Sequence, residues 1–213
     1  MMPGGKPNLP RRALLWSAAS VAAMMAGLPA WADTLDQPLR ALYAALEQAM
    51  RDGRSVPFPQ RFDALAPAVD QAFDLETVLK VSVGSRWDAM DSGVRARLLT
   101  VFRRFTVATY VSNFDKYGGE HFRILSGSRD LGADRIVGTE IVSETGDPVR
   151  MDYIMRDDNG TWRAVDVLLD GSISRVAVQR SDFRKILANG DADGLIASLR
   201  RKIADLSGGT LNS

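Results

Sequence analysis

The chain of 213 residues contains no cysteine and a single histidine, His121. Without thiols there is no disulfide, no thiol nucleophile and no cysteine-bound metal, so packing alone must stabilise the folded state. A transition-metal site needs several nitrogen or sulfur ligands at suitable spacing, which one histidine does not supply. We therefore expect neither a metal nor another cofactor.

The chain also lacks an excess of charge of either sign. Its 27 lysines and arginines nearly balance 26 aspartates and glutamates, for a formal net charge of +1. Nucleic-acid partners and anionic membrane surfaces attract proteins through clustered positive charge, which this composition does not provide. We expect no nucleic-acid partner and no electrostatic attachment to a membrane.

Long apolar runs are scarce, and the main one lies at the N-terminus. Residues 13–28 carry no charge, basic residues precede them, and the small-x-small motif at residues 30–32 follows. This order predicts a cleaved signal peptide over residues 1–32. The pair Arg11-Arg12 also fits a twin-arginine signal, so the export route is open between that pathway and the general secretory one.

Residues 33–213 have the length of one ordinary domain and contain no internal repeat and no low-complexity linker. No later stretch is long and apolar enough to span a bilayer. We expect a single exported domain that acts outside the cytoplasm and is not an integral membrane protein.

Apolar residues recur at helical spacing in six parts of this domain. The segment at residues 92–117 is apolar nearly all round in its second half, which is typical of a helix covered on both sides. Asp74 is placed to cap one short helix, and Gly84 to end it. The six expected helices cover residues 35–50, 62–73, 75–83, 92–117, 173–187 and 191–206.

The apolar period changes to two after Gly118-Gly119. Four strands are expected, at residues 122–124, 137–141, 149–155 and 162–169. The turn at residues 157–160, Asp-Asp-Asn-Gly, is typical of a hairpin because Asn and Gly accept positive φ. The prediction is an α+β fold: a four-stranded antiparallel twisted sheet wrapped by about six helices, helices first and last, with an internal apolar cavity.

Catalytic patterns are lacking too. No Gly-x-Ser-x-Gly motif accompanies His121, which we interpret as a solvated residue at a strand end. Asp166 and Asp170 in one strand would lie about 13 Å apart, which is too far for a retaining carboxylate pair. We expect Asp166 to hold a hydrogen bond and Asp170 to begin a turn, and we assign no catalytic residue.

Several segments together resemble the MlaC (toluene-tolerance) family of periplasmic lipid-transport proteins. They cover nearly the whole exported domain in order, which makes the resemblance more specific than any one motif. The segments are Phe73-Asp74 through Val83-Gly84 and Trp87, Phe102-Arg103-Arg104-Phe105 with Thr109-Tyr110, Tyr117-Gly118-Gly119, Trp162 through Gly171, Arg180-Ser181-Asp182-Phe183, and Gly190 with Asp193 through Leu199.

The chain departs from the phospholipid-carrying members after the last expected strand. Those members usually have Gly-Val-Ser-Leu and then an Asn-Tyr-Arg run, whereas this chain has Gly-Ser-Ile-Ser at residues 171–174 and Ala-Val-Gln-Arg at residues 177–180. This variant resembles the hopanoid-associated HpnM branch. The resemblance leaves the lipid open between a hopanoid and a phospholipid.

The resemblance implies a non-enzymatic soluble carrier that supports outer-membrane maintenance. It would take lipid from an inner-membrane transporter or lipid-domain partner, enclose its apolar body, and deliver it to an outer-membrane partner. The predicted lipid-binding residues lie on the central helix, before it, and on the sheet. They are Val83, Trp87, Leu98, Val101, Phe102, Phe105, Tyr110, Val137, Ile141, Met151, Tyr153, Met155, Val165, Val167 and Leu169.

Two other functions stay open on the sequence. One is an isomerase or dehydratase on a similar cone-shaped scaffold, which would use Asp166 or His121 together with Tyr153. The other is an adaptor that binds no lipid and has a solid core. A closed polar pocket at Asp166 would favour the enzyme, and a core without a cavity would favour the adaptor.

Overall fold

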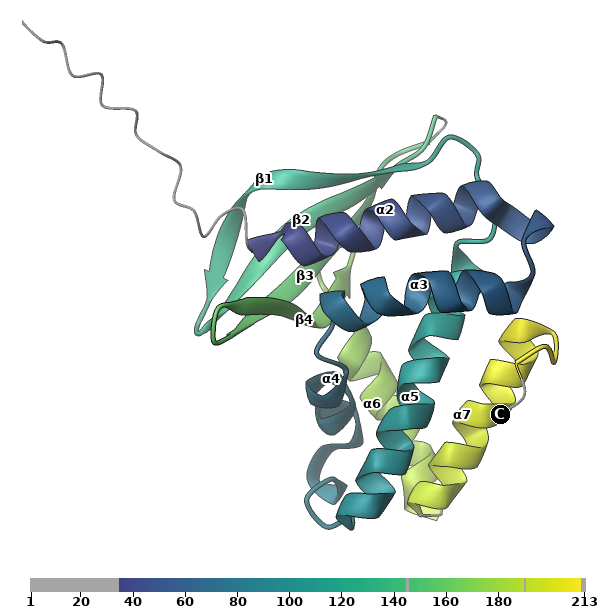
Figure 1. Cartoon of the computed structure of the whole chain (residues 1–213). Helices are drawn as coiled ribbons and strands as arrows, with labels where there is room; N and C mark the ends of the chain where they lie inside the picture. The colour runs from purple at the N-terminus through teal and green to yellow at the C-terminus, as the bar shows by residue number, and fades with distance from the viewer. Residues whose placement is uncertain (1–34, 145, 190, 212–213) are drawn as a thin grey trace, which may run out of the picture.

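The computed structural model describes residues 35–144, 146–189 and 191–211. The expected signal peptide at residues 1–32 lies outside them. Six α-helices and five strands occur in this described part, labelled as in Figure 1. The elements are α2 (Gln37–Asp52), α3 (Phe58–Ala72), α4 (Leu75–Val83), α5 (Ser92–Asn113), β1 (His121–Leu131), β2 (Asp134–Val142), β3 (Val149–Asp158), β4 (Thr161–Leu169), β5 (Ile173–Ser174), α6 (Arg175–Asn189) and α7 (Ala192–Ser207).

The short helix α4 shows how the sequence sets the ends of an element. The Asp74 carboxylate accepts a hydrogen bond from the backbone N–H of Thr77, which satisfies a donor at the start of the helix. Gly84 ends the helix with a φ of 72°, a conformation that favours glycine. The predicted cap and both predicted ends of this helix are confirmed.

Two other helices differ from the expected ones. α5 ends at Asn113, and Phe114 takes a non-helical conformation instead of continuing to residue 117. α3 extends from Phe58 to Ala72, so it begins four residues before the expected start at residue 62, and it continues through Pro67. Proline at this position removes one helical hydrogen bond, so the helix must be stabilised by its buried face, which includes Phe62, Leu65 and Val69.

The sheet is an antiparallel meander with the strand order β1-β2-β3-β4-β5. The expected hairpin turn between β3 and β4 is confirmed, since Asn159 and Gly160 have φ values of 54° and 88°. The expectation of four strands is wrong. Ile173 and Ser174 pair with Leu169 and Leu168 as a fifth strand.

The same fifth strand corrects the expected start of the next helix. Asp170 and Gly171 have φ values of 51° and 69°, which turns the chain back on β4. Backbone pairing therefore holds Ile173 and Ser174 in extended conformation, and α6 begins at Arg175 instead of residue 173.

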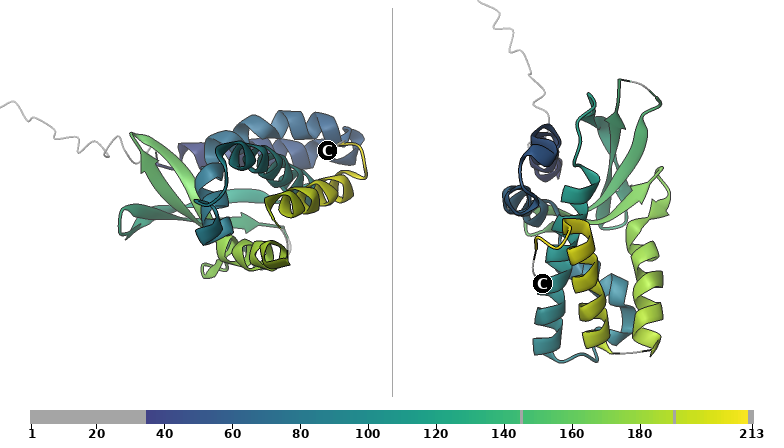
Figure 2. Two further views of the ribbon diagram at one scale, coloured as in Figure 1. Left: turned by 90° about the horizontal axis from the view of Figure 1, so that it is seen from below. Right: turned by 90° about the vertical axis from the view of Figure 1, so that its right-hand side faces the viewer.

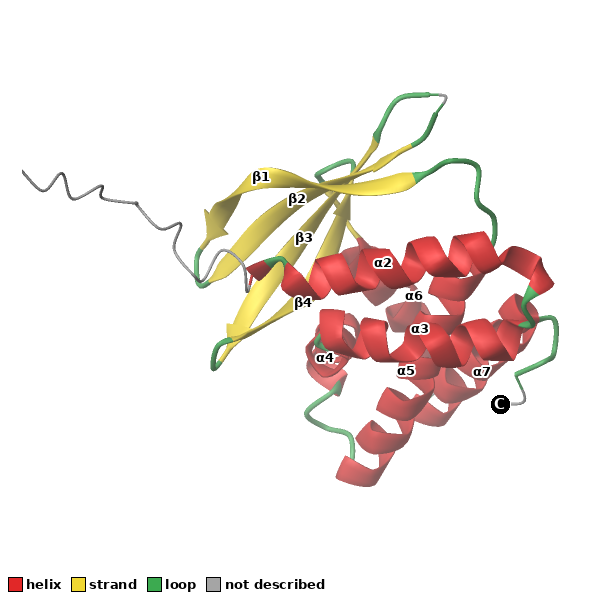
Figure 3. Cartoon of the chain, turned by 45° about the horizontal axis from the view of Figure 1, so that its top comes forward, coloured by secondary structure: helices red, strands yellow, loops and turns green. Residues whose placement is uncertain are grey.

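The helices form two groups around the sheet (Figures 1 and 2). α2 and α3 lie side by side along one face of the sheet. α4, α5, α6 and α7 form a bundle that extends away from the side of the sheet where β4 and β5 lie. Figure 3 shows that α5 is central among the helices.

The strand faces that point to the helices are apolar, and the opposite faces carry charge. On β3, Met151, Tyr153 and Met155 are buried against the helices. On the other face Asp152 accepts hydrogen bonds from Arg129 at 2.5 Å and Arg150 at 2.7 Å, and its side chain is 1% exposed. The alternation therefore leaves only one face of the sheet suited to an apolar ligand. Among the helices of the described residues, none is long and apolar enough to cross a bilayer.

Candidate functional site

A partly open pocket of about 430 Å³ lies between α5 and α6, next to β3 and β4. This volume falls within the roughly 300–1,000 Å³ that is usual for small-molecule sites. Most of the lining is aliphatic or aromatic. The lining residues are Phe73, Leu75, Val78, Phe102, Phe105, Thr106, Thr109, Tyr110, Asn113, Phe114, Met151, Tyr153, Asp166, Val167, Leu169, Arg175, Val176, Val178, Gln179, Asp182, Phe183 and Lys202.

Helical periodicity builds two walls of the pocket. α5 presents Phe102, Phe105, Thr106, Thr109 and Tyr110, which recur at spacings of three and four residues and so share one helix face. The hydroxyls of Thr106 and Thr109 donate hydrogen bonds to carbonyl oxygens one turn earlier on α5, at 3.0 and 2.8 Å. The hydroxyl protons of both threonines are therefore already used in hydrogen bonds within α5 and are not free to donate to a ligand in the pocket.

The opposite wall comes from α6. Val176, Gln179 and Phe183 line the pocket at helical spacing, and Val176 and Phe183 are buried. The ring of Phe183 meets that of Phe102 edge to face with centroids 6.2 Å apart, so the two walls contact each other at one end.

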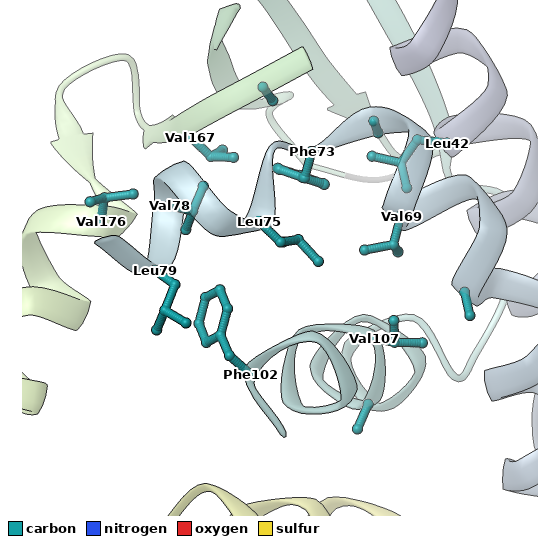
Figure 4. Close-up of a cluster of buried hydrophobic side chains, with 14 of the residues drawn as sticks. Leu42, Val69, Phe73, Leu75, Val78, Leu79, Phe102, Val107, Val167 and Val176 are labelled. Carbon is teal, nitrogen blue, oxygen red and sulfur yellow. The ribbon is translucent and has the colours of Figure 1, made fainter. Parts of the chain in front are cut away.

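Figure 4 shows the pocket side chains beside the solid part of the core. Leu42 and Val69 lie on one side, Val167 and Val176 lie on the other, and Phe73 is between them. None of the described residues that line the pocket belongs to α2 or α3. The apolar interior therefore has a packed region under α2 and α3 and a pocket region between α5 and α6.

Exposed lining residues mark the mouth of the pocket. Asn113, Arg175, Asp182 and Lys202 are exposed and lie on α5, α6 and α7. The Lys202 ammonium is 5.7 Å from the centroid of the Phe105 ring, a cation–π contact at the edge of the apolar lining. The mouth carries charges of both signs and the interior is apolar, an arrangement suited to an amphipathic ligand.

Asp166 lines the pocket, but its carboxylate is engaged by the backbone. It accepts hydrogen bonds from the N–H groups of Val167 at 2.7 Å and Val176 at 3.1 Å, and from the Ser174 hydroxyl. The Ser174 oxygen in turn accepts a hydrogen bond from the N–H of Ala177. Asp166 thus joins β4 to the first turn of α6, which agrees with the hydrogen-bonding role expected for it.

Three tyrosines extend from the pocket into the packed region. Tyr110 and Tyr153 line the pocket, and Tyr43 lies behind them on α2. The ring of Tyr153 meets that of Tyr43 edge to face, with centroids 6.1 Å apart. The Tyr43 hydroxyl donates to Thr139 Oγ1 at 2.7 Å, and that hydroxyl donates to the carbonyl of Met151 at 2.7 Å.

Burial raises the pKa of each of these three phenols above its usual value. The hydrogen bond that Tyr43 makes to Thr139 opposes this effect on the pKa of Tyr43, but its contribution is smaller than that of burial. The phenols therefore remain neutral at physiological pH and act as a fixed polar group beside the apolar pocket.

The structure places the predicted lipid-binding residues in two sets. The first set lines the pocket: Phe102, Phe105, Tyr110, Met151, Tyr153, Val167 and Leu169. The second set lies in other parts of the core or beside it: Val83, Trp87, Leu98, Val101, Val137, Ile141, Met155 and Val165. The lipid-binding role stays a prediction for the first set, and geometry gives no support to it for the second.

The wall formed by α6 was not among the residues predicted from the sequence. Val176, Gln179 and Phe183 have the spacing of one helix face, and that signal was available in the sequence. The predicted residues came from the sheet, the central helix and the segment before it, and none came from α6, because spacing along one helix does not say which other helix it will face. The structure has a partly open pocket with an additional helical wall, and the internal apolar cavity expected from the sequence stays a prediction.

His121 lies at the start of β1, exposed and outside the pocket lining, as expected for a solvated strand-end residue. Over the described ranges, no cluster of three or more His, Asp or Glu side chains is placed to hold a metal ion.

Comparisons with known proteins agree with this architecture. The family model described as MlaC protein matches residues 40–201. A solved structure of the phospholipid-binding protein from Ralstonia solanacearum, in complex with a phospholipid, superposes with a TM-score of 0.69 at 16% identity, covering 82% of this chain and 97% of that one. A search of curated protein sequences finds no significant match.

Proposed function

Since the chain belongs to the MlaC family, we propose that it is a periplasmic lipid carrier that holds the apolar part of a hopanoid or phospholipid in the pocket between α5 and α6. The observation that supports this most directly is the pocket itself, in a fold shared with a protein described as phospholipid-binding. The signal peptide expected over residues 1–32 would deliver the chain to the periplasm.

The physical chemistry of the pocket fits a carrier. Each buried methylene contributes about 0.8 kcal/mol, so a lipid chain enclosed by aromatic and aliphatic walls is strongly favoured over the same chain in water. Such a lipid would not leave spontaneously. Loading would require docking to an inner-membrane transporter or lipid-domain partner, and release would require docking to an outer-membrane partner. The apolar channels of these partners would keep the free-energy change of each lipid transfer close to zero.

A carrier of this kind needs no catalytic group. The alternative enzyme would use Asp166 or His121 with Tyr153, but Asp166 accepts three hydrogen bonds around the start of α6 and His121 lies outside the pocket. The alternative adaptor requires a solid core, and a pocket of about 430 Å³ counts against it. We therefore favour lipid carriage over both.

Lipid extraction from gently purified protein tests the proposal. Mass spectrometry should show a co-purifying lipid, and its mass should distinguish a hopanoid from a phospholipid. Phe105→Asp and Met151→Arg should each lower lipid occupancy, because a charge in the pocket is costly to desolvate. Val149→Arg is the matched control, since Val149 lies on the same strand but is 50% exposed. Protein that is always empty, or pocket variants that fold and load normally, would contradict the proposal.

A further inference from the structure

Three polar side chains of the pocket lining are already engaged by the protein. The hydroxyls of Thr106 and Thr109 donate hydrogen bonds within α5. The Asp166 carboxylate accepts three hydrogen bonds around the start of α6, so its negative charge is met by donors of the chain itself. These three groups therefore present no unmet charge to a ligand.

The charged side chains at the mouth of the pocket differ in this respect. Oδ1 of Asp182 lies 3.7 Å from the ammonium of Lys185, so a neighbour on the same helix compensates its charge. Arg175 on α6 and Lys202 on α7 also line the pocket, and neither forms an ion pair with a carboxylate of the described residues. The mouth therefore carries two positive charges, from two different helices, that no acidic residue in the described part of the chain neutralises.

The helices around the mouth add to this positive potential. α5 carries four arginines and no acidic residue, α6 carries four basic residues and one aspartate, and α7 carries three basic residues and two aspartates. The strands β1 to β4 hold six arginines against seven acidic residues. Positive charge is therefore concentrated on the bundle that carries the mouth, although the whole chain has a net charge of only +1.

We propose that the mouth selects lipids whose headgroup has a net negative charge, with an anionic phosphate held by Arg175 and Lys202. This inference rests on the proposed lipid-carrier function and narrows the class of lipid. Guanidinium and ammonium groups are the side chains that proteins use to bind phosphate. The apolar body of the lipid would lie against the aromatic lining, which includes Phe102 and Phe105. A zwitterionic headgroup gains less, because the same two cations repel its positive group.

Titration calorimetry on delipidated protein tests this with single-chain lipids, used below the concentration at which they form micelles so that no membrane is present. Myristoyl-lysophosphatidylglycerol and myristoyl-lysophosphatidylcholine share one tail and differ in net charge. At low salt the anionic lipid should bind about three- to ten-fold more tightly, the gain expected of exposed charge pairs. The difference should shrink at high salt, which screens exposed charges. Inorganic phosphate alone should not bind measurably, which separates a lipid headgroup from free phosphate as the ligand.

Variants identify the residues responsible. The double variant Arg175→Gln with Lys202→Gln should abolish the preference and leave binding of the zwitterionic lipid within about two-fold of wild type, since the exposed charges contribute little to holding the tail. Asp182→Asn should act in the opposite direction and increase the preference, because it removes the acidic residue of the mouth.

The matched control is the double variant Arg184→Gln with Arg200→Gln. These arginines are exposed on α6 and α7, lie outside the pocket lining and have no ion pair among the described residues. The control removes the same net charge as the mouth variant, so it should keep most of the preference if the two mouth cations contact the headgroup. Circular dichroism confirms that each variant folds.

The outcomes separate this inference from the proposed function. If neither lysolipid binds and no lipid co-purifies, the carrier function is wrong. If both lysolipids bind equally, or if the two double variants lose the preference alike, the carrier function stands and the headgroup selection is overturned. A hopanoid without an acidic group as the only co-purifying lipid would overturn the selection in the same way. Binding of inorganic phosphate as tight as that of the anionic lysolipid would overturn it too, since the cations would then need no lipid.

Discussion

The packed region under α2 and α3 and the pocket region between α5 and α6 use the same kinds of side chain but different packing. In the packed region Leu42 and Val69 are completely buried. In the pocket region Leu75 and Val167 are also buried from solvent, yet they line a space of about 430 Å³. The difference teaches that burial from solvent and close packing are separate properties. Matched substitutions, one in each region, can test whether the two regions differ in packing.

Truncation of a buried leucine to alanine should have the largest effect on stability. The loss should be larger in the packed region than in the pocket region. Leu42→Ala should lower the free energy of unfolding by about 3–5 kcal/mol, because the cavity left behind has no contacts to replace those lost. Leu75→Ala should cost about 2 kcal/mol, since part of that side chain already faces open space. Urea denaturation of both variants measures this. Equal costs would show that the pocket region is packed as tightly as the rest.

Enlarging a buried side chain should also destabilise the packed region more than the pocket region. Val69→Phe should destabilise the protein by about 1–3 kcal/mol, because a closely packed core has no room for a ring. Val167→Phe should change stability little and reduce lipid occupancy, because the ring can enter the pocket. Thermal unfolding and lipid extraction measure the two effects. If Val167→Phe is the more destabilising variant, the pocket is not an open space.

The buried tyrosines lie at the boundary of the two regions, and they should make stability fall at alkaline pH. Burial raises the pKa of Tyr43 and Tyr153 in the folded protein, whereas in the unfolded chain each ionises near pH 10. The unfolded state therefore binds fewer protons above that pH. Stability should be intact below about pH 10 and then fall by up to about 1.4 kcal/mol per pH unit for each tyrosine.

Urea denaturation at increasing pH measures this loss. Tyr43→Phe should make the fall less steep, because one of the ionising groups is gone. Tyr117→Phe is the control and should leave the slope close to that of the wild-type protein, since Tyr117 is 48% exposed and is not one of the buried phenols. A free energy of unfolding that stays level above pH 10 would contradict the burial of these phenols.

The smallest effect is expected for an ion pair that joins the two regions. Arg103 on α5 donates to Asp70 on α3, with Nε 2.6 Å from Oδ1. The two side chains are 41% and 37% exposed, so solvent screens the pair. Arg103→Gln should cost less than about 1 kcal/mol in urea denaturation, and the loss should shrink further at high salt. A larger, salt-independent loss would mean that this pair holds the regions together.

Local signals in the sequence predicted several elements well. Asp74 and Gly84 mark the two ends of α4, and Asn159-Gly160 marks the hairpin between β3 and β4, because capping and positive φ depend on only a few neighbouring residues. The fifth strand escaped prediction for the opposite reason. Ile173 and Ser174 are too few to show a period, and they are extended because they pair with β4.

The candidate site was predicted only in part. Phe102, Phe105 and Tyr110 belong to the apolar pattern of α5 and were predicted to bind lipid, and the structure places them on the pocket. Leu98 and Val101 belong to the same apolar pattern but lie outside the lining. Apolar periodicity indicates which face of a helix is covered, and it does not indicate whether protein atoms or an open space cover a given turn.

The sequence by itself determined the α+β class, the alternating faces of the sheet and the resemblance to lipid-transport proteins, because these depend on residue order and local chemistry. The tertiary structure alone decided where the core is hollow, that α6 forms a wall of the hollow, and that Tyr43 and Thr139 form a hydrogen-bonded series ending at the Met151 carbonyl. A space between elements belongs to no single segment. It arises only when distant segments pack with atoms left out between them.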